Sequence, residues 1–253
     1  MTSLSSRPTS IRTAADLAGP IGFLGGAFML HPDVLGPGKE AGYPGGFAYY
    51  VVGRGGVLGD VDADVVVSAF GFFAPPLVAS LWNAGVVVEG ARAGARRYAE
   101  ACSEWGRRRL ETFAEASRLA DLVAKVVDNA DVGGLSLFAG WRRIDRPDDP
   151  VGRCYLLLHV LRELRGSVHL VACLASGLTP LDAVLANPSG GVDQAEKFGW
   201  SGPFSIGADI GPKFAVAENL TNELMGRHLD VLTDDELAEL VQLVSTAHAT
   251  AFP

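Results

Sequence analysis

The pattern of apolar and polar positions along the chain predicts a protein built mainly from α-helices. No segment alternates polar and apolar residues over the length of a strand, whereas apolar residues recur at helical spacing in several places. The clearest case covers residues 86–127, where acids and arginines fill the remaining positions and a break is expected near Gly106. Its apolar positions are Ala91, Ala95, Tyr98, Cys102, Trp105 and Leu110.

Residues that start or stop helices divide the rest of the chain. Thr179 precedes Pro180, and Thr233 with Glu236 forms a capping box, so each threonine is expected to begin a helix. Gly177 is expected to end the apolar segment before it. The expected helices cover residues 13–30, 62–73, 75–82, 155–176, a short segment from 179, 212–228 and 233–249. The expected glycine- and proline-rich connections cover residues 31–46, 128–149 and 187–203.

A weak internal similarity suggests two helical units. Gly53-Arg54 leads through an acidic turn into the apolar residues 65–73, and Gly140-Trp141-Arg142 leads through another into residues 155–160. A helix that starts at proline follows each. We therefore predict an all-α fold with a disordered lead (1–13), an N-terminal helical unit (14–130) and a C-terminal helical unit (131–253), the two units facing each other across a cleft.

Residues 155–176 carry polar groups within an apolar segment. Because a helix turns by about 100° per residue, Tyr155, Arg162, His169 and Cys173 fall within roughly 40° of one another on one face. Burying such groups without partners costs several kcal/mol. We expect them to pair with one another, with another helix or with a bound molecule.

This face supplies the candidate catalytic residues. His169 could act as a general acid or base because its ordinary pKa lies close to neutrality. Arg162 could hold an anionic group, with Arg165 at the edge of the face, and Glu163 is expected to bond a neighbouring helix. The alternative is an ion-pair network between helices that includes a hydrogen-bonded histidine and has no role beyond the fold.

Two further sets of residues are candidates for substrate binding. Arg54 and the glycines around it could form a backbone nest for an anion, or a tight turn. Aromatic side chains could line an apolar pocket, and plain core packing is equally compatible with them. The candidates for such a pocket are Tyr49, Tyr50, Phe72, Phe73, Trp82 and Tyr155.

Composition narrows the classes of function. The net charge is −8, and the clusters of arginine are interleaved with acids, which argues against sequence-independent binding of nucleic acid. The three cysteines lack metal-ligand spacing and suit a reducing cytoplasm. Asp60, Asp62 and Asp64 fit the start of a helix better than a calcium loop, so no metal and no cofactor is expected. No segment predicts a signal sequence or a membrane span.

Several motifs resemble a family of actinobacterial proteins described generically as helix-turn-helix proteins. Residues 161–178 fit the pattern L-R-E-x-R-G-x-x-H followed by A-x-L-x-x-G-L, and residues 53–59 are similar to G-R-A-A-P-L-G. Residues 70–75 and Gly199-Trp200-Ser201 also match. The resemblance implies an all-helical N-terminal part followed by a winged-helix-like unit.

The chain departs from this family after Ser201. The family usually continues with a further helix and a wing that leads to L-T-x-x-G-R, whereas this chain has only residues 202–212 there, with Lys197 and Lys213 as the cations nearby. The winged-helix-like part is therefore expected to be degenerate. Reading the major groove needs a helix that presents Arg, Lys, Asn or Gln, so the sequence argues against DNA binding.

These observations lead to one principal hypothesis and two alternatives. The principal one is a cytoplasmic protein that binds a small, mostly apolar molecule with an acidic or carbonyl group, anchored by Arg162 and Arg54. With His169 as proton shuttle, it would be a cofactor-independent isomerase, cyclase or lyase of actinobacterial specialised metabolism. The alternatives are a ligand-responsive helix-turn-helix transcriptional regulator, with a homodimer as one option, and a purely structural partner protein.

Overall fold

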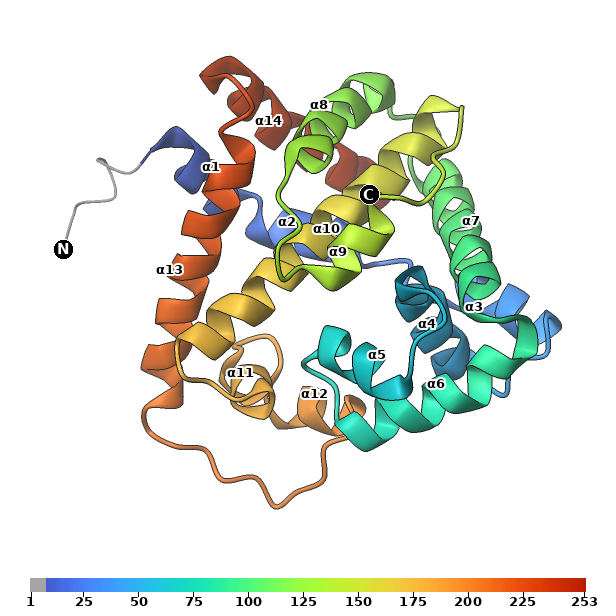
Figure 1. The fold of residues 1–253 in the computed structure, drawn as a ribbon. Coiled ribbons are helices and arrows are strands. Elements are labelled where there is room, and N and C mark those ends of the chain that lie inside the picture. The colour runs from blue at the N-terminus through green and yellow to red at the C-terminus, as the bar shows by residue number, and fades with distance from the viewer. Residues whose placement is uncertain (1–7) are drawn as a thin grey trace.

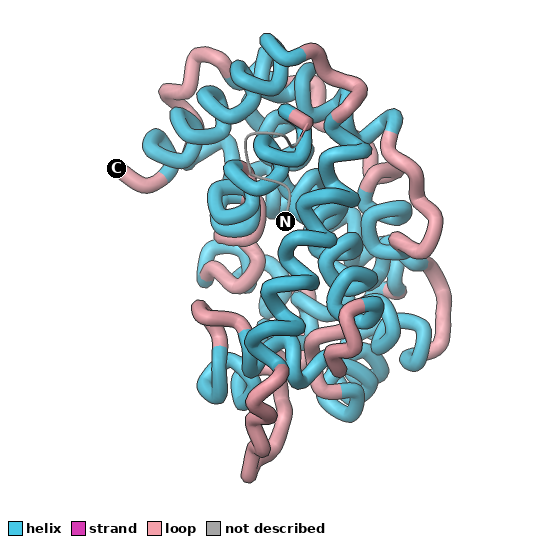
Figure 2. The backbone as a smooth tube through the Cα atoms, turned by 90° about the vertical axis from the view of Figure 1, so that its left-hand side faces the viewer, coloured by secondary structure: helices cyan, strands magenta, loops and turns pink. Residues whose placement is uncertain are grey.

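The computed structural model describes residues 8–253, which form α-helices and no β-strand (Figures 1 and 2). The all-α prediction is confirmed. The helices of the first half are α1 (Thr9–Asp16), α2 (Ala18–Leu24), α3 (Pro32–Glu40), α4 (Gly46–Gly55), the 3-10 helix η2 (Gly56–Leu58), α5 (Ala63–Phe70), α6 (Pro75–Glu89) and α7 (Ala91–Arg109). Those of the second half are α8 (Ala116–Asn129), α9 (Ser136–Trp141), α10 (Pro150–Ala175), α11 (Pro180–Ala186), α12 (Gly191–Lys197), α13 (Ile210–Leu229) and α14 (Asp234–Ala251).

The long helix α10 runs through the middle of the molecule (Figure 1). Asp149 caps its start by accepting a hydrogen bond from the backbone N–H of Gly152 (2.7 Å), and Pro150 occupies its first position. Helices α2, α7, α8, α9 and α13 all pack against it. Every residue from 154 to 161 is consequently buried, including Tyr155, and the next half-buried polar side chain after this stretch is Arg162.

The capping signals are confirmed, whereas three predicted connections contain helices. Thr233 forms the predicted capping box, and Thr179 caps its helix as predicted and also forms a capping box with Asp182. The helices α3, α9 and α12 lie within segments that we expected to be irregular. In α3, the Nδ1 atom of His31 accepts a hydrogen bond from the N–H of Asp33 (3.2 Å), and Pro32 fills the first position. These start signals outweigh the glycines and prolines that follow.

The predicted break near Gly106 is wrong. Helix α7 continues to Arg109, and within residues 86–127 the chain leaves helical geometry at Gly90, between α6 and α7, and again between α7 and α8. A Cβ atom at position 106 would lie 2.2 Å from the Cβ of Tyr155. Glycine is therefore needed there because α7 and α10 touch closely.

One large hydrophobic core extends from α1 to α14 and takes residues from both sides of residue 130. A smaller cluster joins the end of α10 to α11, α12 and the start of α13. The two stretches that suggested an internal repeat lead into dissimilar helices, α5 of 8 residues and α10 of 26, so the structure gives the repeat no support. Of the predicted lead, residues 1–7 lie outside the described residues, and residues 9–13 belong to α1.

Within the described residues no single helix is long and apolar enough to cross a membrane, although α10 and α11, bent by 105° at their junction, pass that test as a pair.

Candidate functional site

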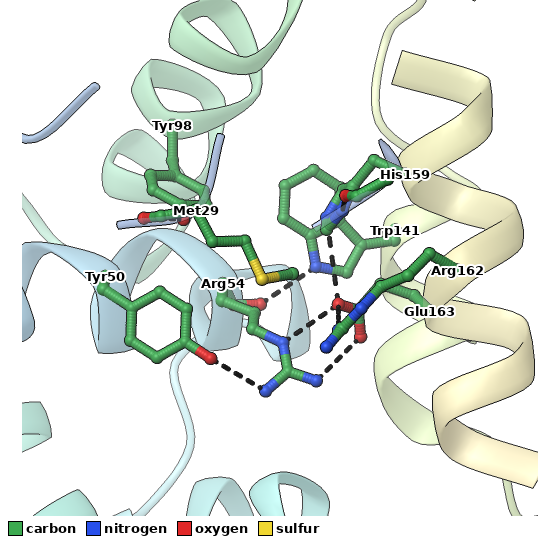
Figure 3. Close-up of polar contacts among 9 residues, drawn as sticks. Met29, Tyr50, Arg54, Tyr98, Trp141, His159, Arg162 and Glu163 are labelled. Carbon is green, nitrogen blue, oxygen red and sulfur yellow. Dashed lines mark hydrogen bonds and ion pairs between the residues drawn. The ribbon is translucent and has the colours of Figure 1, made fainter. Parts of the chain in front are cut away.

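A buried ion pair joins α4 to α10 at the centre of the candidate site (Figure 3). Arg54 donates from Nε and Nη2 to the two carboxylate oxygens of Glu163, each at 3.0 Å. The Glu163 side chain is fully buried, and that of Arg54 is 9% exposed. Arg54 also donates to the hydroxyl oxygen of Tyr50 (3.2 Å), and the indole N–H of Trp141 donates to the Arg54 carbonyl (3.1 Å). The expectation that Glu163 bonds a neighbouring helix is confirmed.

Both members of this pair are held in their charged forms. Burial alone would raise the pKa of Glu163, but the charges of Arg54 and Arg162 outweigh burial and hold that pKa below its usual range. Burial likewise opposes the charge of Arg54, and Glu163 outweighs it, so the pKa of Arg54 is raised. The pair is therefore a fixed carboxylate and a fixed guanidinium inside the protein.

His159 lies beside the pair and is neutral at pH 7. Its Nδ1 lies 3.0 Å from the carbonyl oxygen of Gly25, which can only accept, so Nδ1 carries the proton. Its Nε2 atom has no hydrogen-bond partner and lies 3.9 Å from a carboxylate oxygen of Glu163. Burial lowers the pKa of His159 to about 4, against the attraction of Glu163.

A second arginine makes the charges around Glu163 unequal. Arg162 donates from Nη1 to Glu163 (2.6 Å), and its side chain is 27% exposed. Two guanidinium groups thus share one carboxylate, and the neutral His159 adds no charge. The cluster carries one positive charge in excess, on the arginine that reaches the surface.

Arg162 borders an open pocket of about 460 Å³, called here the Arg162 pocket. Its walls are mostly apolar, with Tyr50 and His31 as the other polar side chains. Gly25 is required where α2 approaches α10, because a Cβ there would lie 2.8 Å from the Cβ of Arg162. The pocket is lined by Gly26, Ala27, Met29, Leu30, His31, Pro32, Tyr50, Phe73, Arg162 and Phe198.

His169 borders a different pocket, of about 220 Å³, called here the His169 pocket. Thr221 donates its hydroxyl proton to the Ala217 carbonyl (2.7 Å), so it accepts from Nδ1 of His169 (3.0 Å). This leaves Nε2 as the free base, 3.5 Å from the sulfur of Cys173. Burial lowers the pKa of His169, against the charge of Glu218, which lies 3.3 Å away. Phe72 and Phe198 also line this pocket, with residues of α11, α12 and the turn between them.

An aromatic stack separates the two pockets. The rings of Phe73 and Phe198 are stacked with their centroids 4.0 Å apart, and Phe198 lines both pockets. The backbone N–H of Ala74 donates to the Phe198 carbonyl (2.8 Å), and the Trp200 indole donates to the Phe72 carbonyl (2.9 Å). The structure therefore places the two predicted catalytic side chains, Arg162 and His169, in neighbouring pockets and not in one.

The predicted binding residues divide among the two pockets and the core. Tyr50 and Phe73 line the Arg162 pocket, and Phe72 lines the His169 pocket. Arg165 turns to α13, where it contacts Asn222 (3.0 Å) and Glu218 (3.2 Å). The remaining side chains are buried in the core and line neither pocket; they are Tyr49, Arg54, Trp82 and Tyr155.

The glycines beside Arg54 serve packing, and Arg54 itself is not at a surface. A Cβ on Gly53 would lie 2.4 Å from the Tyr98 ring, and one on Gly56 would lie 2.1 Å from the Ala91 carbonyl oxygen. Gly55 and Gly56 both have right-handed helical dihedrals. The motif thus brings α4 and η2 close to α7, and the exposed anion nest that the sequence suggested is not formed there.

Sequence patterns did not identify the pocket-lining residues that come from segments far from α10 in the sequence. His31 and the preceding glycines and methionine fell in segments without a recognisable site motif, although His31-Pro32-Asp33 is a readable helix start. Phe198 gave no signal, because its role depends on α12 packing beside the residues that follow α5. Among the described residues no group of three or more His, Cys, Asp or Glu side chains is placed to hold a metal ion.

The helices α11 and α12 are two short helices joined by a short connection, the arrangement of a helix-turn-helix. They pack together and are joined by residues 187–190, which include Gly190. The second helix exposes Asp193, Glu196 and Lys197, so acids outnumber cations on it. The segment 198–209, where a wing would begin, contains no strand.

Comparison with known proteins gives one match. Residues 14–203 match a group of proteins described as a helix-turn-helix family. The match begins in α1, ends after α12, and leaves α13 and α14 outside it. No curated protein and no solved structure matches the chain.

Proposed function

Because the chain belongs to this helix-turn-helix family, we propose that it uses an all-helical scaffold of that family to bind a small molecule in the Arg162 pocket. The ligand is mostly apolar and carries one carboxylate or similar acidic group. The observation that carries this proposal is the uneven charge at Glu163: two arginines share one carboxylate, and the surplus guanidinium borders the pocket.

The donors at the inner end of the pocket suit a carboxylate. Arg162 uses Nη1 for Glu163, which leaves its other N–H groups for a ligand. The hydroxyl oxygen of Tyr50 accepts from Arg54, so its own proton can be donated. An arginine fork and a phenol together provide the charge-assisted bonds that hold carboxylates in apolar surroundings. A ligand carboxylate would also bring the charge of the cluster to zero.

The outer part of the pocket suits an apolar body. Met29, Phe73 and Phe198 form much of its wall, and Leu30, which is 43% exposed, lies at its edge. Phe47 is 41% exposed and contacts the Tyr50 ring, with centroids 6.3 Å apart. Covering these side chains would remove apolar surface from water, which favours binding at about 25 cal/mol per Å².

Catalysis, if it accompanies binding, would involve His169. Its Nε2 is a free base at neutral pH, because burial lowers the pKa of His169 and Nδ1 holds the proton. A molecule anchored on Arg162 would have to pass the Phe73–Phe198 stack to reach this base. The proposal is therefore first a binding function, with acid–base chemistry as its extension.

Family membership favours a second candidate, a transcriptional regulator that responds to the same ligand. The helices α11 and α12 would supply its DNA-binding pair, and the His169 pocket lies against them. The acidic surface of α12 opposes this candidate, since phosphate contacts need clustered cations.

A thermal-shift screen tests the principal proposal. The protein is melted with a panel of aromatic and branched aliphatic carboxylic acids, each paired with its methyl ester. A bound acid at about a hundred times its Kd adds about 2.7 kcal/mol of stability. We expect acids to raise the melting temperature more than their esters do. Equal shifts for acid and ester, or no shift with any acid, would contradict it.

A further inference from the structure

Three arginines surround a third pocket, which lies between η2, the start of α7 and the residues after α9. The pocket has a volume of about 200 Å³ and shares no residue with the Arg162 pocket. Arg92 and Arg96 enter it from successive turns of α7, and Arg143 enters it from the chain that follows α9. All three side chains are exposed.

These arginines differ from most others because they form no hydrogen bond and no ion pair. No hydrogen bond or ion pair joins the side chain of Arg92, Arg96 or Arg143 to another described residue. The next arginine on the same helix, Arg97, forms a two-bond pair with Glu89 at 2.8 Å. Three guanidinium groups without an ion pair therefore converge on one hollow in a protein whose net charge is −8.

Glycines shape the pocket by allowing the elements around it, η2, α7 and α9, to pack closely against one another. A Cβ on Gly140 would lie 2.7 Å from Val57, so only glycine lets α9 approach η2 this closely. Gly56 permits the same approach of η2 to the Ala91 carbonyl. Gly59 has a positive φ of 86°, and a Cβ there would lie 2.8 Å from a guanidinium nitrogen of Arg92. The absence of a side chain at Gly59 thus leaves room for the Arg92 guanidinium at the pocket edge.

The net charge of the pocket lining favours a phosphate over a carboxylate. Asp145 also lines the pocket, so the three arginines leave a local charge of two positive units. A phosphate monoester carries about −1.5 to −2 at pH 7, whereas a carboxylate carries only one negative charge. Arginine forks match phosphate oxygens with paired hydrogen bonds. The side chains of Val57, Ala95 and Ile144 give the rest of the lining an apolar character.

We propose that this pocket binds the phosphoryl group of a small phosphorylated molecule through Arg92, Arg96 and Arg143. A nucleic-acid backbone is a poorer fit, because it would bring an extended polyanion against a protein of charge −8. The volume of about 200 Å³ admits one phosphoryl group and a small organic part. The site is separate from the Arg162 pocket and does not depend on the function proposed for it.

Calorimetric titration tests this proposal with inorganic phosphate and phenyl phosphate, in a phosphate-free buffer at constant ionic strength. We expect both to bind, phenyl phosphate more tightly because of the apolar lining. The variants Arg92→Gln and Arg143→Gln should each weaken binding about tenfold or more, since a hydrogen bond to a charged group contributes about 1.5–3 kcal/mol. Their melting temperatures without phosphate should stay unchanged, because neither side chain has a partner in the protein.

A control variant locates the binding. Arg108→Gln changes an exposed arginine further along α7, outside the pocket, and should bind phenyl phosphate like the wild-type protein. The absence of phosphate binding, or equal affinity in all variants, would overturn the proposal. So would a single-stranded oligonucleotide that binds more tightly than phenyl phosphate and loses affinity in the same two variants.

Discussion

Arg54 and Glu163 lie 109 residues apart in the sequence and form a two-bond ion pair in the interior, with both N–O distances at 3.0 Å. The pair joins α4 to the central helix α10, and Arg162 of α10 contacts the same carboxylate. The interior of the fold and the Arg162 pocket are therefore connected through one side chain, Glu163.

Glu163→Gln is expected to destabilise the protein by about 3–5 kcal/mol, because it leaves the buried Arg54 without its counter-charge. Urea denaturation measures this free energy of unfolding. The double variant Arg54→Met with Glu163→Leu should recover much of the loss, since Arg162 can turn toward solvent. A cost below about 1 kcal/mol for Glu163→Gln would mean that the pair is not buried as described.

Stability is expected to fall as the pH drops from 6.5 toward 4. Burial lowers the pKa of His159 from 6.5 to about 4. Between these pH values the imidazole is therefore protonated in the unfolded chain and neutral in the folded protein. The stabilisation is fully present above pH 6.5, and its loss by pH 4 amounts to about 3 kcal/mol. Glu163, whose pKa is lowered, contributes stability that is present above its ordinary pKa of 4.5 and is lost at still lower pH.

The variant His159→Asn isolates this contribution, because its amide can still donate to the Gly25 carbonyl and does not titrate. His169 and His228 also have lowered pKa values and remain in the variant, so only part of the slope should disappear. Unfolding free energies measured by urea at several pH values between 4 and 7 give the two slopes. Identical slopes in the variant and the wild-type protein would refute the role of His159.

Alanine substitutions at two glycines should change the stability of the protein in opposite directions, because the two glycines have different surroundings. Gly53→Ala would place a Cβ 2.4 Å from the Tyr98 ring, and overpacking of this kind costs about 1–3 kcal/mol. Gly166→Ala lies within α10 with no atom in the way, so it should stabilise by up to about 1 kcal/mol through helix propensity. Thermal melting of both variants compares them directly. Destabilisation by Gly166→Ala would show that α10 is more crowded at that position than the structure indicates.

Local signals predicted much of the fold. The helix starts at Thr179 and Thr233, and the helix stop at Gly177, depend on neighbouring residues, so the sequence alone locates them. The wrong prediction of a break at Gly106 arises because that glycine depends on a contact with a residue distant in the sequence. A glycine inside a helical pattern indicates either a break or a close contact, and only the position of Tyr155 shows that it is a contact.

The candidate site was less predictable because its parts meet only in three dimensions. Helical spacing placed Arg162 and His169 on one face of α10, but it could not show that the Phe73–Phe198 stack separates them. The partnership of Glu163 with another helix followed from the cost of burying a carboxylate, whereas the identity of Arg54 as that partner did not. Tyr155 was assigned to the site from its face on the helix, and burial by α2 and α7 places it in the core.

DNA binding by this chain is expected to be absent. A gel-shift assay with the region upstream of its own gene, at low salt and with the full chain, should show no retardation. The reason is the excess of acids on α12 and over the protein as a whole. Retardation that survives an excess of unrelated competitor DNA would favour the regulator instead.

The affinity of the Arg162→Gln variant for the best carboxylic acid of the panel tests the proposed binding function most directly. The variant should fold, because Arg54 still neutralises Glu163. Its Kd should rise about tenfold or more, whereas Arg153→Gln, on the same helix but outside the pocket, should bind like the wild-type protein. Unchanged affinity in Arg162→Gln would contradict the assignment of the surplus guanidinium as the anchor of the ligand.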